Sequence, residues 1–189
     1  MATLRLLFTK EAQASYISHL DTMRTFQRVF PRAELHLKHS NGFHPHPIIS
    51  IVLPLPVGQS SDCELLDFET VEETDGAGIA EKLNTGLPAG LRVRECYPVT
   101  RPVREFTFLR ARLELLYDNG VPAGTADALR ALFARETLMI EKRTKHKELA
   151  QIDIAPLIRE MTLTEQDGSI LADAVVAAQN PGLNPAYLA

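Results

Sequence analysis

The order of patterned segments in the first hundred residues constrains the fold more than any other feature of this sequence. The pattern of a β-strand occurs in four compact apolar or alternating runs, at 4–8, 48–53, 64–71 and 91–97. Apolar residues recur at helical steps between 18 and 30, and a shorter run over 79–87 also predicts a helix. The predicted order, strand-helix-strand-strand-helix-strand, is that of a ferredoxin-like unit.

The second half of the chain repeats part of this pattern. Strands are predicted at 106–117 and 138–142, a helix at 125–135, and a short turn or helix at 154–158. The Asp167-Gly168 turn signal predicts a hairpin between 160–164 and 170–177. We therefore expect an α+β fold of tandem ferredoxin-like units, over 1–100 and 101–189. The second unit is expected to be incomplete, or truncated, at its C-terminal end.

Composition excludes several classes of protein. The chain has 189 residues, 45% of them hydrophobic, and a formal charge of -4, so it is globular and no general polyanion binder. No apolar run approaches the length of a membrane span, and no signal peptide precedes the first strand. The two cysteines, Cys63 and Cys96, form neither a disulfide framework nor an iron–sulfur motif. A cytoplasmic protein is expected, with no membrane partner and no cofactor.

The first predicted helix has recognisable start and end signals and one apolar face. Ser18 and Asp21 form a variant of the capping box at its start. Its apolar face is expected to consist of Leu20, Met23, Phe26, Val29 and Phe30. Pro31 is expected to end or distort the helix.

Arginines form a stripe opposite this apolar face. Arg24, Arg28 and Arg32 follow one another at intervals of four residues, although Pro31 makes the place of Arg32 in the stripe doubtful. A solvated amphipathic face explains such a stripe, and so does a phosphate-binding surface, because guanidinium groups suit phosphate. Under the second interpretation Arg24 and Arg28 hold phosphate.

The segment SNGFHPHPIIS, at 40–50, combines a turn with a stiff backbone. Asn41-Gly42 supplies the turn, and each proline holds the histidine before it in an extended conformation. His44 and His46 can then face the same ligand. We expect His19, Phe43, His44 and His46 to line one partly open pocket, with Asp21 or Arg24 at its edge.

Three roles are open for these histidines. A His-x-His pair is compatible with a metal site that His19 or His39 completes, but no third ligand has a motif spacing, and we expect no metal. A structural loop with hydrogen-bonded imidazoles is the second role. The third is binding or acid–base catalysis, for which His19, His44 and Asp21 are the candidates.

A second basic cluster lies in the second half of the chain. It includes Lys142, Arg143 and Lys145, which suit either a solvated turn or a polyanion-binding site. Asp153 follows it between two isoleucines, where it is expected to cap the turn that contains Pro156.

Several of these motifs together resemble a known family, the radical-SAM-linked family of bacterial proteins, a domain of unknown function. The distinctive motifs are YISHLDTMR at 16–24, SNGFHPHP at 40–47, LPVG at 55–58 and LPAGL at 87–91. The resemblance continues through Glu64 and, more weakly, from Lys142 to Asp153. It implies a radical SAM protein or domain as partner and an RNA or ribosome-related context, without implying a reaction.

The first functional hypothesis is an accessory RNA-binding or substrate-presenting module that works with a radical SAM enzyme. Arg24 and Arg28 would hold phosphate, while Asn41, Phe43, His44 and His46 would contact a base or substrate. The second is a metal-independent RNA-processing or RNA-modifying enzyme whose base is His19 or His44. The third is a scaffold whose acidic 61–81 segment docks a protein.

Overall fold

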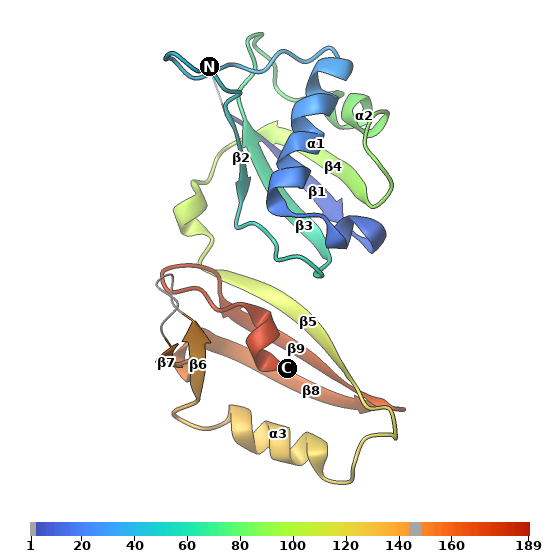
Figure 1. Cartoon of the computed structure of the whole chain (residues 1–189), viewed down its shortest axis with the longest axis vertical. Coiled ribbons are helices and arrows are strands. Elements are labelled where there is room, and N and C mark those ends of the chain that lie inside the picture. Colours follow the sequence, from blue (N-terminus) through green and yellow to red (C-terminus); the bar gives the residue numbers. More distant parts are fainter. Residues whose placement is uncertain (1–2, 144–148) are drawn as a thin grey trace. The chain divides into compact units, whose positions relative to one another are not determined.

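The computed structural model describes residues 3–143 and 149–189, which form two compact units, Met1–Val103 and Arg104–Ala189 (Figure 1). The boundary lies three residues beyond the position expected from the sequence. Each unit combines antiparallel β-structure with few helices, so the fold class is α+β. In the described ranges, no helix has both the length and the apolar character needed to cross a membrane.

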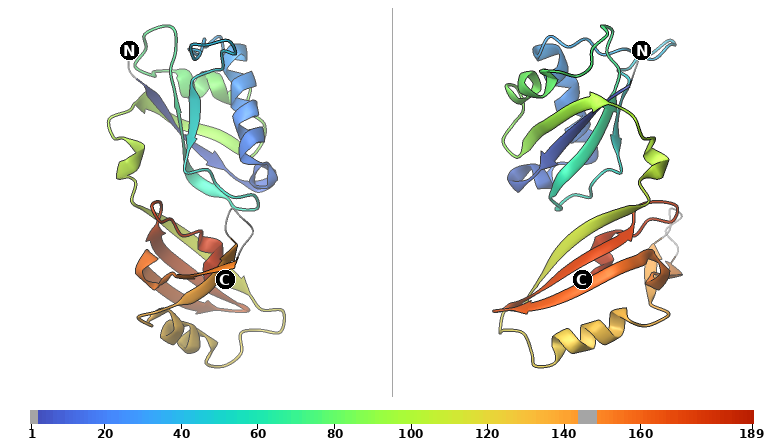
Figure 2. Two further views of the ribbon diagram at one scale, coloured as in Figure 1. Left: turned by 60° about the vertical axis from the view of Figure 1, so that its left-hand side comes forward. Right: turned by 180° about the vertical axis from the view of Figure 1, so that it is seen from behind.

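The first unit has the element order expected from the sequence. Its elements are β1 (Leu4–Lys10), a 3-10 turn η1 (Ala12–Tyr16), α1 (His19–Arg32), β2 (Ile49–Val52), β3 (Ser61–Phe68), α2 (Ile79–Asn84) and β4 (Leu91–Pro98). The strands form one sheet in the order β2-β3-β1-β4, and all neighbouring strands are antiparallel. Both helices cover the same face of this sheet (Figures 1 and 2).

Strand alternation builds the core of the first unit. Leu4, Leu6 and Phe8 are buried and point to one side of β1, because successive strand residues face opposite ways. Phe8 packs edge-on against Phe26 of α1, with ring centroids 5.0 Å apart. Phe30, one turn further along α1, lies 4.8 Å from the ring of Phe68 on β3. This aromatic row fixes α1 on the sheet.

One expectation about α1 is corrected. Leu20 is 61% exposed, whereas Thr22 is buried with the phenylalanines. Leu20 precedes Phe26 by six residues, which places it about 120° around the helix from the buried stripe. The helix ends at Arg32, one residue beyond Pro31, so Pro31 lies in its last turn. In the last turn a proline removes only one helical hydrogen bond, and the amide of Ala33 still donates to carbonyls of the preceding turn.

The second unit contains one strand more than the sequence pattern predicted for it, and its strands do not form a single sheet. Its elements are η2 (Val103–Glu105), β5 (Phe108–Leu116), α3 (Thr125–Phe133), β6 (Met139–Arg143), β7 (Leu149–Asp153), η3 (Ala155–Leu157), β8 (Ile158–Gln166), β9 (Ser169–Ala177) and η4 (Pro185–Leu188). One sheet has the order β5-β9-β8, and β6 and β7 form a separate two-stranded ribbon. A tandem repeat of one fold is therefore not established, although the β8–β9 hairpin and the short turn at η3 are confirmed.

Candidate functional site

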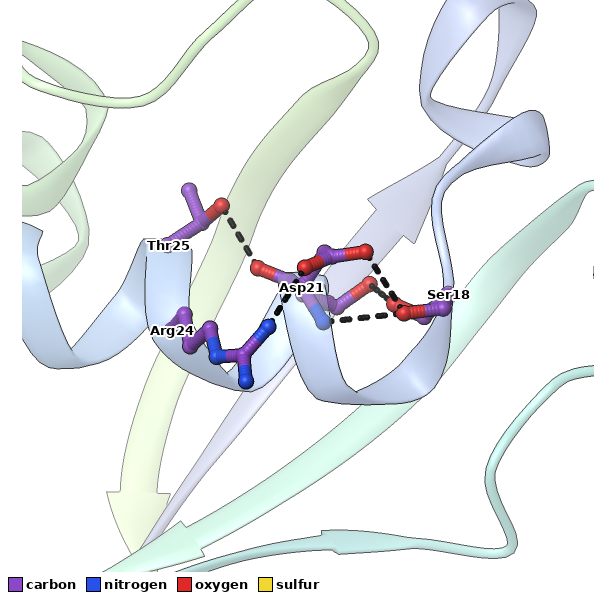
Figure 3. A network of polar contacts seen from close by, with 5 residues as sticks. Ser18, Asp21, Arg24 and Thr25 are labelled. Carbon is purple, nitrogen blue, oxygen red and sulfur yellow. Dashed lines mark hydrogen bonds and ion pairs between the residues drawn. The ribbon is translucent and has the colours of Figure 1, made fainter.

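The start of α1 is held by the hydrogen-bond network that the capping pattern predicted (Figure 3). The amide of Asp21 donates to the Ser18 hydroxyl at 3.1 Å, and this hydroxyl donates to the Asp21 carboxylate at 2.7 Å. Thr25 donates to the Asp21 carbonyl. The Ser18 hydrogen bond, followed by that from Arg24, holds the pKa of the Asp21 carboxyl below its ordinary value. Asp21 is thus a structural cap in this arrangement.

The arginine stripe is exposed along α1. Arg24 Nη1 lies 3.1 Å from Asp21 Oδ1 in a solvent-exposed pair. Arg28 and Arg32 are also exposed, and no ion pair involving them occurs among the described residues. Exposed pairs such as Asp21–Arg24 are weak, so Arg24 can exchange its carboxylate for a phosphate at small cost. The stripe can therefore contact a polyanion.

The segment between α1 and β2 forms a short arm that extends the sheet. Leu37 bridges to Thr70, and the amide of Lys38 donates to the Glu69 carbonyl. Closer to the tip, His39 bridges to Pro47. The arm carries the SNGFHPHP motif at its turn.

The tip of this arm is closed by Ser40 and His46. The amide of Ser40 donates to the His46 carbonyl at 2.8 Å, and the amide of His46 donates to the Ser40 hydroxyl at 3.2 Å. The same hydroxyl lies 2.8 Å from His46 Nδ1. Gly42 supplies a backbone φ of 139° that other residues rarely adopt. A stiff, closed turn results.

The closed turn presents its remaining side chains to solvent. Phe43 is fully exposed, and Asn41, His44 and His46 are also exposed. An exposed phenylalanine gains none of the free energy that burial of its ring would supply. The aromatic side chain at the tip is thus available for contact with another molecule.

The expected pocket shared by His19 and the loop is not formed. The arm lies at the end of the first unit where α1 finishes, whereas α1 begins at the opposite end (Figures 1 and 2). The whole length of α1, fourteen residues from His19 to Arg32, separates His19 from the end that carries the arm. The first turn of α1 was expected to lie beside the loop, but the direction of α1 over the sheet places it at the other end of the unit.

A different cluster surrounds His19. A cavity of about 10 Å³ lies beside it and is lined by Phe8, Lys10, His19, Thr22, Ile51, Pro54, Leu55 and Glu64. The Nδ1 atom of His19 is buried and has no hydrogen-bond partner in the part of the chain that the structure describes. A cavity of this size has room for one water molecule, which would satisfy that nitrogen.

Lys10 and Glu64 supply the charge in this cluster. Lys10 is 3% exposed, and its ammonium donates to the carbonyls of Ser15 at 3.4 Å and Ile17 at 3.1 Å. Burial lowers the pKa of Lys10, which the nearby Glu64 carboxylate partly opposes. Burial raises the pKa of Glu64, while a hydrogen bond from Ser61 and the charge of Lys10 act in the other direction. Perturbed titratable groups beside a cavity are a common mark of a functional site.

Alternation along the strands could have revealed this cluster. Lys10 continues the series Leu4, Leu6, Phe8 at steps of two, which places its side chain on the core face of β1. Glu64 stands in the same relation to Leu66 and Phe68 on β3. The predicted strand 4–8 stopped two residues before Lys10, whereas Glu64 was the first residue of the predicted strand 64–71, and its place on the apolar face was overlooked.

The second basic cluster is only partly described. Lys142 Nζ lies 6.0 Å from the centre of the Tyr187 ring, and Arg143 ends β6. Lys145 lies outside the described residues. Asp153 accepts hydrogen bonds from the amides of Leu138 at 2.8 Å and Ala155 at 3.0 Å, so it caps the turn at η3 as expected.

Metal ligands do not converge in the described ranges. No group of three or more histidine, cysteine, aspartate or glutamate side chains is placed to hold a metal ion there. His36 pairs with Glu72 at 2.9 Å, and His39 contacts the Leu37 carbonyl at 3.1 Å.

Comparison with known proteins gives the family. A search of curated proteins found no match. A family model described as an uncharacterized protein conserved in bacteria, DUF2344, matches residues 3–185. This range includes α1, the arm with its SNGFHPHP tip and both units of the fold. The chain therefore belongs to the DUF2344 family of uncharacterized proteins conserved in bacteria.

Proposed function

We propose that this chain is an RNA-binding or substrate-presenting module that works with a radical SAM enzyme. The observation that supports RNA binding best is the fully exposed Phe43 at the tip of a closed, proline-stiffened turn. Unpaired bases stack on exposed aromatic rings, and each such contact contributes about 1–3 kcal/mol. His44 and His46, beside Phe43, offer hydrogen bonds to base edges.

The arginines of α1 would supply the electrostatic part of binding. Arg28 and Arg32 lie in the second half of α1, toward the end of the unit that carries the arm. Arg24 and Arg28 would hold phosphates while Phe43 holds a base. The formal charge of the chain is -4, so this attraction is local and comes from one helix face.

The radical SAM partner rests on the family resemblance alone. The chain's two cysteines cannot form the three-cysteine motif that ligates the iron–sulfur cluster of such enzymes, so the cluster would belong to the partner. In this proposal the partner carries out the chemistry, and this chain positions the RNA or another substrate.

Fluorescence anisotropy with labelled single-stranded RNA tests the RNA-binding part of the proposal. Wild-type protein should bind, and Phe43→Ala should weaken the affinity by about tenfold, as expected for the loss of one stacked base. Tyr16→Ala is a matched control, because Tyr16 is also an exposed aromatic residue but lies just before the start of α1, away from the arm. Equal losses in both variants, or no binding by the wild type, would contradict the proposal. Absence of RNA binding would favour the protein-docking scaffold.

A second candidate function is supported by the cluster around His19. An imidazole nitrogen that has no hydrogen-bond partner among the described residues, beside a buried lysine and glutamate, could act as a general base in RNA processing. The small cavity argues against it, because only a water fits there. Incubation of labelled RNA with the wild type and with His19→Ala decides: cleavage or modification that is lost in His19→Ala would establish an enzyme.

A further inference from the structure

Strand β5 has one unpaired edge. It pairs with β9 on one side, and in the described part of the chain no strand pairs with the other side. The comparison with the first unit is informative. There β1, which also begins its unit and precedes a helix, pairs with β3 on one edge and with β4 on the other. Six of the seven residues of β1 are buried, whereas β5 alternates between half-buried and exposed residues.

We propose that two copies of this chain associate through their β5 edges, which pair antiparallel about a two-fold axis at Arg112. A six-stranded sheet that is continuous between the copies would result.

The hydrogen-bond ladder identifies the free backbone groups. At the two ends of β5, the amide of Ala178 donates to the Thr107 carbonyl, and the amide of Tyr117 donates to the Gly168 carbonyl. Because bonded and non-bonded pairs alternate in antiparallel sheets, the odd-numbered residues of β5 bond to β9. The even-numbered residues, from Phe108 to Leu116, therefore direct their amides and carbonyls to the free edge. Pairing about Arg112 joins even-numbered residues of one copy to even-numbered residues of the other.

The exposed side chains are complementary in this register. Arg110 faces Glu114 of the second copy, and the symmetry of the pair produces this contact twice. Phe108 faces Leu116 of the second copy, and both are large apolar side chains that the single chain leaves exposed. Opposite charges and apolar pairs directly across from one another are the arrangements that stabilise antiparallel strands.

The inner face of the sheet is complementary as well. Leu109 faces Leu115 of the second copy, and Ala111 faces Leu113. These side chains are only half-buried in the single chain, although the three leucines contact its cores. Pairing would cover them with apolar residues from the second copy and extend the hydrophobic layer.

Other registers are less favourable. A shift of the axis to Ala111 places Arg110 opposite Arg112 and Phe108 opposite Glu114. A shift to Leu113 leaves Phe108 without a partner residue in β5. In the proposed register the two Arg112 side chains meet at the axis. Each lies 3.5 Å from Asp173 of its own chain, a carboxylate that also pairs with Arg110 at 3.3 Å and partly offsets the like charge. The full length of β5 is paired only in this register.

Sedimentation equilibrium over a range of concentrations tests the proposal with charge reversal. The wild type should shift from the mass of one chain to that of two, and Glu114→Arg should raise the dissociation constant about tenfold or more, because arginines would then face arginines. Arg110→Glu combined with Glu114→Arg should restore dimerization. Arg135→Glu reverses an exposed charge outside β5 and should have no effect. A wild type that remains one chain throughout, or equal effects of Glu114→Arg and Arg135→Glu, would overturn the proposal.

An engineered disulfide between the two copies provides a second test, which does not require the charge variants to be stably folded. In the proposed register the two copies of Arg112→Cys lie within the Cα separation that a disulfide needs. Oxidation should therefore give a covalent dimer on a non-reducing gel. The wild type, which keeps Cys63 and Cys96, and Thr162→Cys on β8 are the controls. Crosslinking of Thr162→Cys as efficient as that of Arg112→Cys would refute the β5 interface.

Discussion

The hydroxyl of Ser40 lies 2.8 Å from Nδ1 of His46, and the amide of Ser40 donates to the His46 carbonyl at the same distance. Two residues six positions apart thereby close the turn that carries Phe43. Pro45 and Pro47 restrict the backbone around the closure. A ring on a backbone restricted in this way loses less backbone conformational entropy on binding than a ring on an open loop.

Loss of the Ser40 hydroxyl should weaken RNA binding without unfolding the protein. Ser40→Ala removes the contacts with His46 Nδ1 and with the His46 amide, but keeps the backbone bond between the two residues. We expect affinity for single-stranded RNA to fall about threefold to tenfold, since the loop must be ordered during binding. The free energy of unfolding, measured by thermal denaturation, should change by less than about 0.5 kcal/mol, because the loop is exposed. Ser50→Ala on β2 is the control; an unchanged affinity in Ser40→Ala would show that closure is irrelevant to binding.

Replacement of Arg24 and Arg28 by alanine should change the salt dependence of binding. Each phosphate contact releases a counterion, so the slope of log affinity against log salt should decrease by roughly one unit per arginine removed. Anisotropy titrations at several salt concentrations measure this slope. Arg92→Ala on β4 removes an exposed arginine from the same unit and should leave the slope unchanged. If the double variant keeps the wild-type slope, the α1 face does not contact phosphate.

The buried pair of Arg5 and Asp67 should dominate the stability of the first unit. Arg5 is 2% exposed, and two of its nitrogens bond to the Asp67 carboxylate, at 2.5 and 2.7 Å. Asp67→Ala leaves this guanidinium without its carboxylate partner and should lower the free energy of unfolding by about 3 kcal/mol. Urea denaturation measures the change. Asp62→Ala, at an exposed position, should stay within about 0.5 kcal/mol of the wild type; equal stabilities of the two variants would contradict the role of the pair.

Glu64 should make stability depend on pH in the acidic range. Its folded-state pKa is raised above the ordinary 4.5 by burial, so the folded protein binds this proton more tightly than the unfolded chain. The resulting stabilisation is fully present below pH 4.5 and is lost as pH rises through the raised pKa. Glu64→Gln should remove this part of the pH dependence, measured by urea denaturation between pH 4 and 7, and Glu95→Gln is the surface control. The same pH profile in Glu64→Gln and the wild type would show that Glu64 does not titrate in this way.

The sequence predicted the first unit well because its signals were local. The apolar steps at Phe26, Val29 and Phe30, and the Ser18 cap, require no knowledge of distant residues. The division of the second unit into a three-stranded sheet and a separate ribbon was not predictable in the same way. Pairing of β5 with β9 is decided by contacts between segments far apart in the chain. β7 pairs with the nearby β6, but the pattern of its five residues was not assigned to a strand.

The sequence named candidate residues for a site but did not predict how they are arranged. Sequence spacing placed His19 and the SNGFHPHP loop in one half of the chain, but the direction of α1 separates them. Lys10 was missed because the predicted strand ended at residue 8, and Glu64 was missed because a charged residue at a strand position is usually assigned to the solvent face. Only the alternation with Leu4, Leu6 and Phe8 indicates that Lys10 points inward.

Tryptophan fluorescence offers the most direct measurement of the proposed contact between Phe43 and RNA. The chain contains no tryptophan, so Phe43→Trp introduces a single indole at the tip of the arm. Titration with single-stranded RNA should quench its emission to saturation, because a base stacked on the indole deactivates the excited state, and Arg24→Ala with Arg28→Ala should shift the midpoint to higher RNA concentration. If anisotropy reports RNA binding while the indole emission stays unchanged, Phe43 does not contact a base and the central claim is wrong.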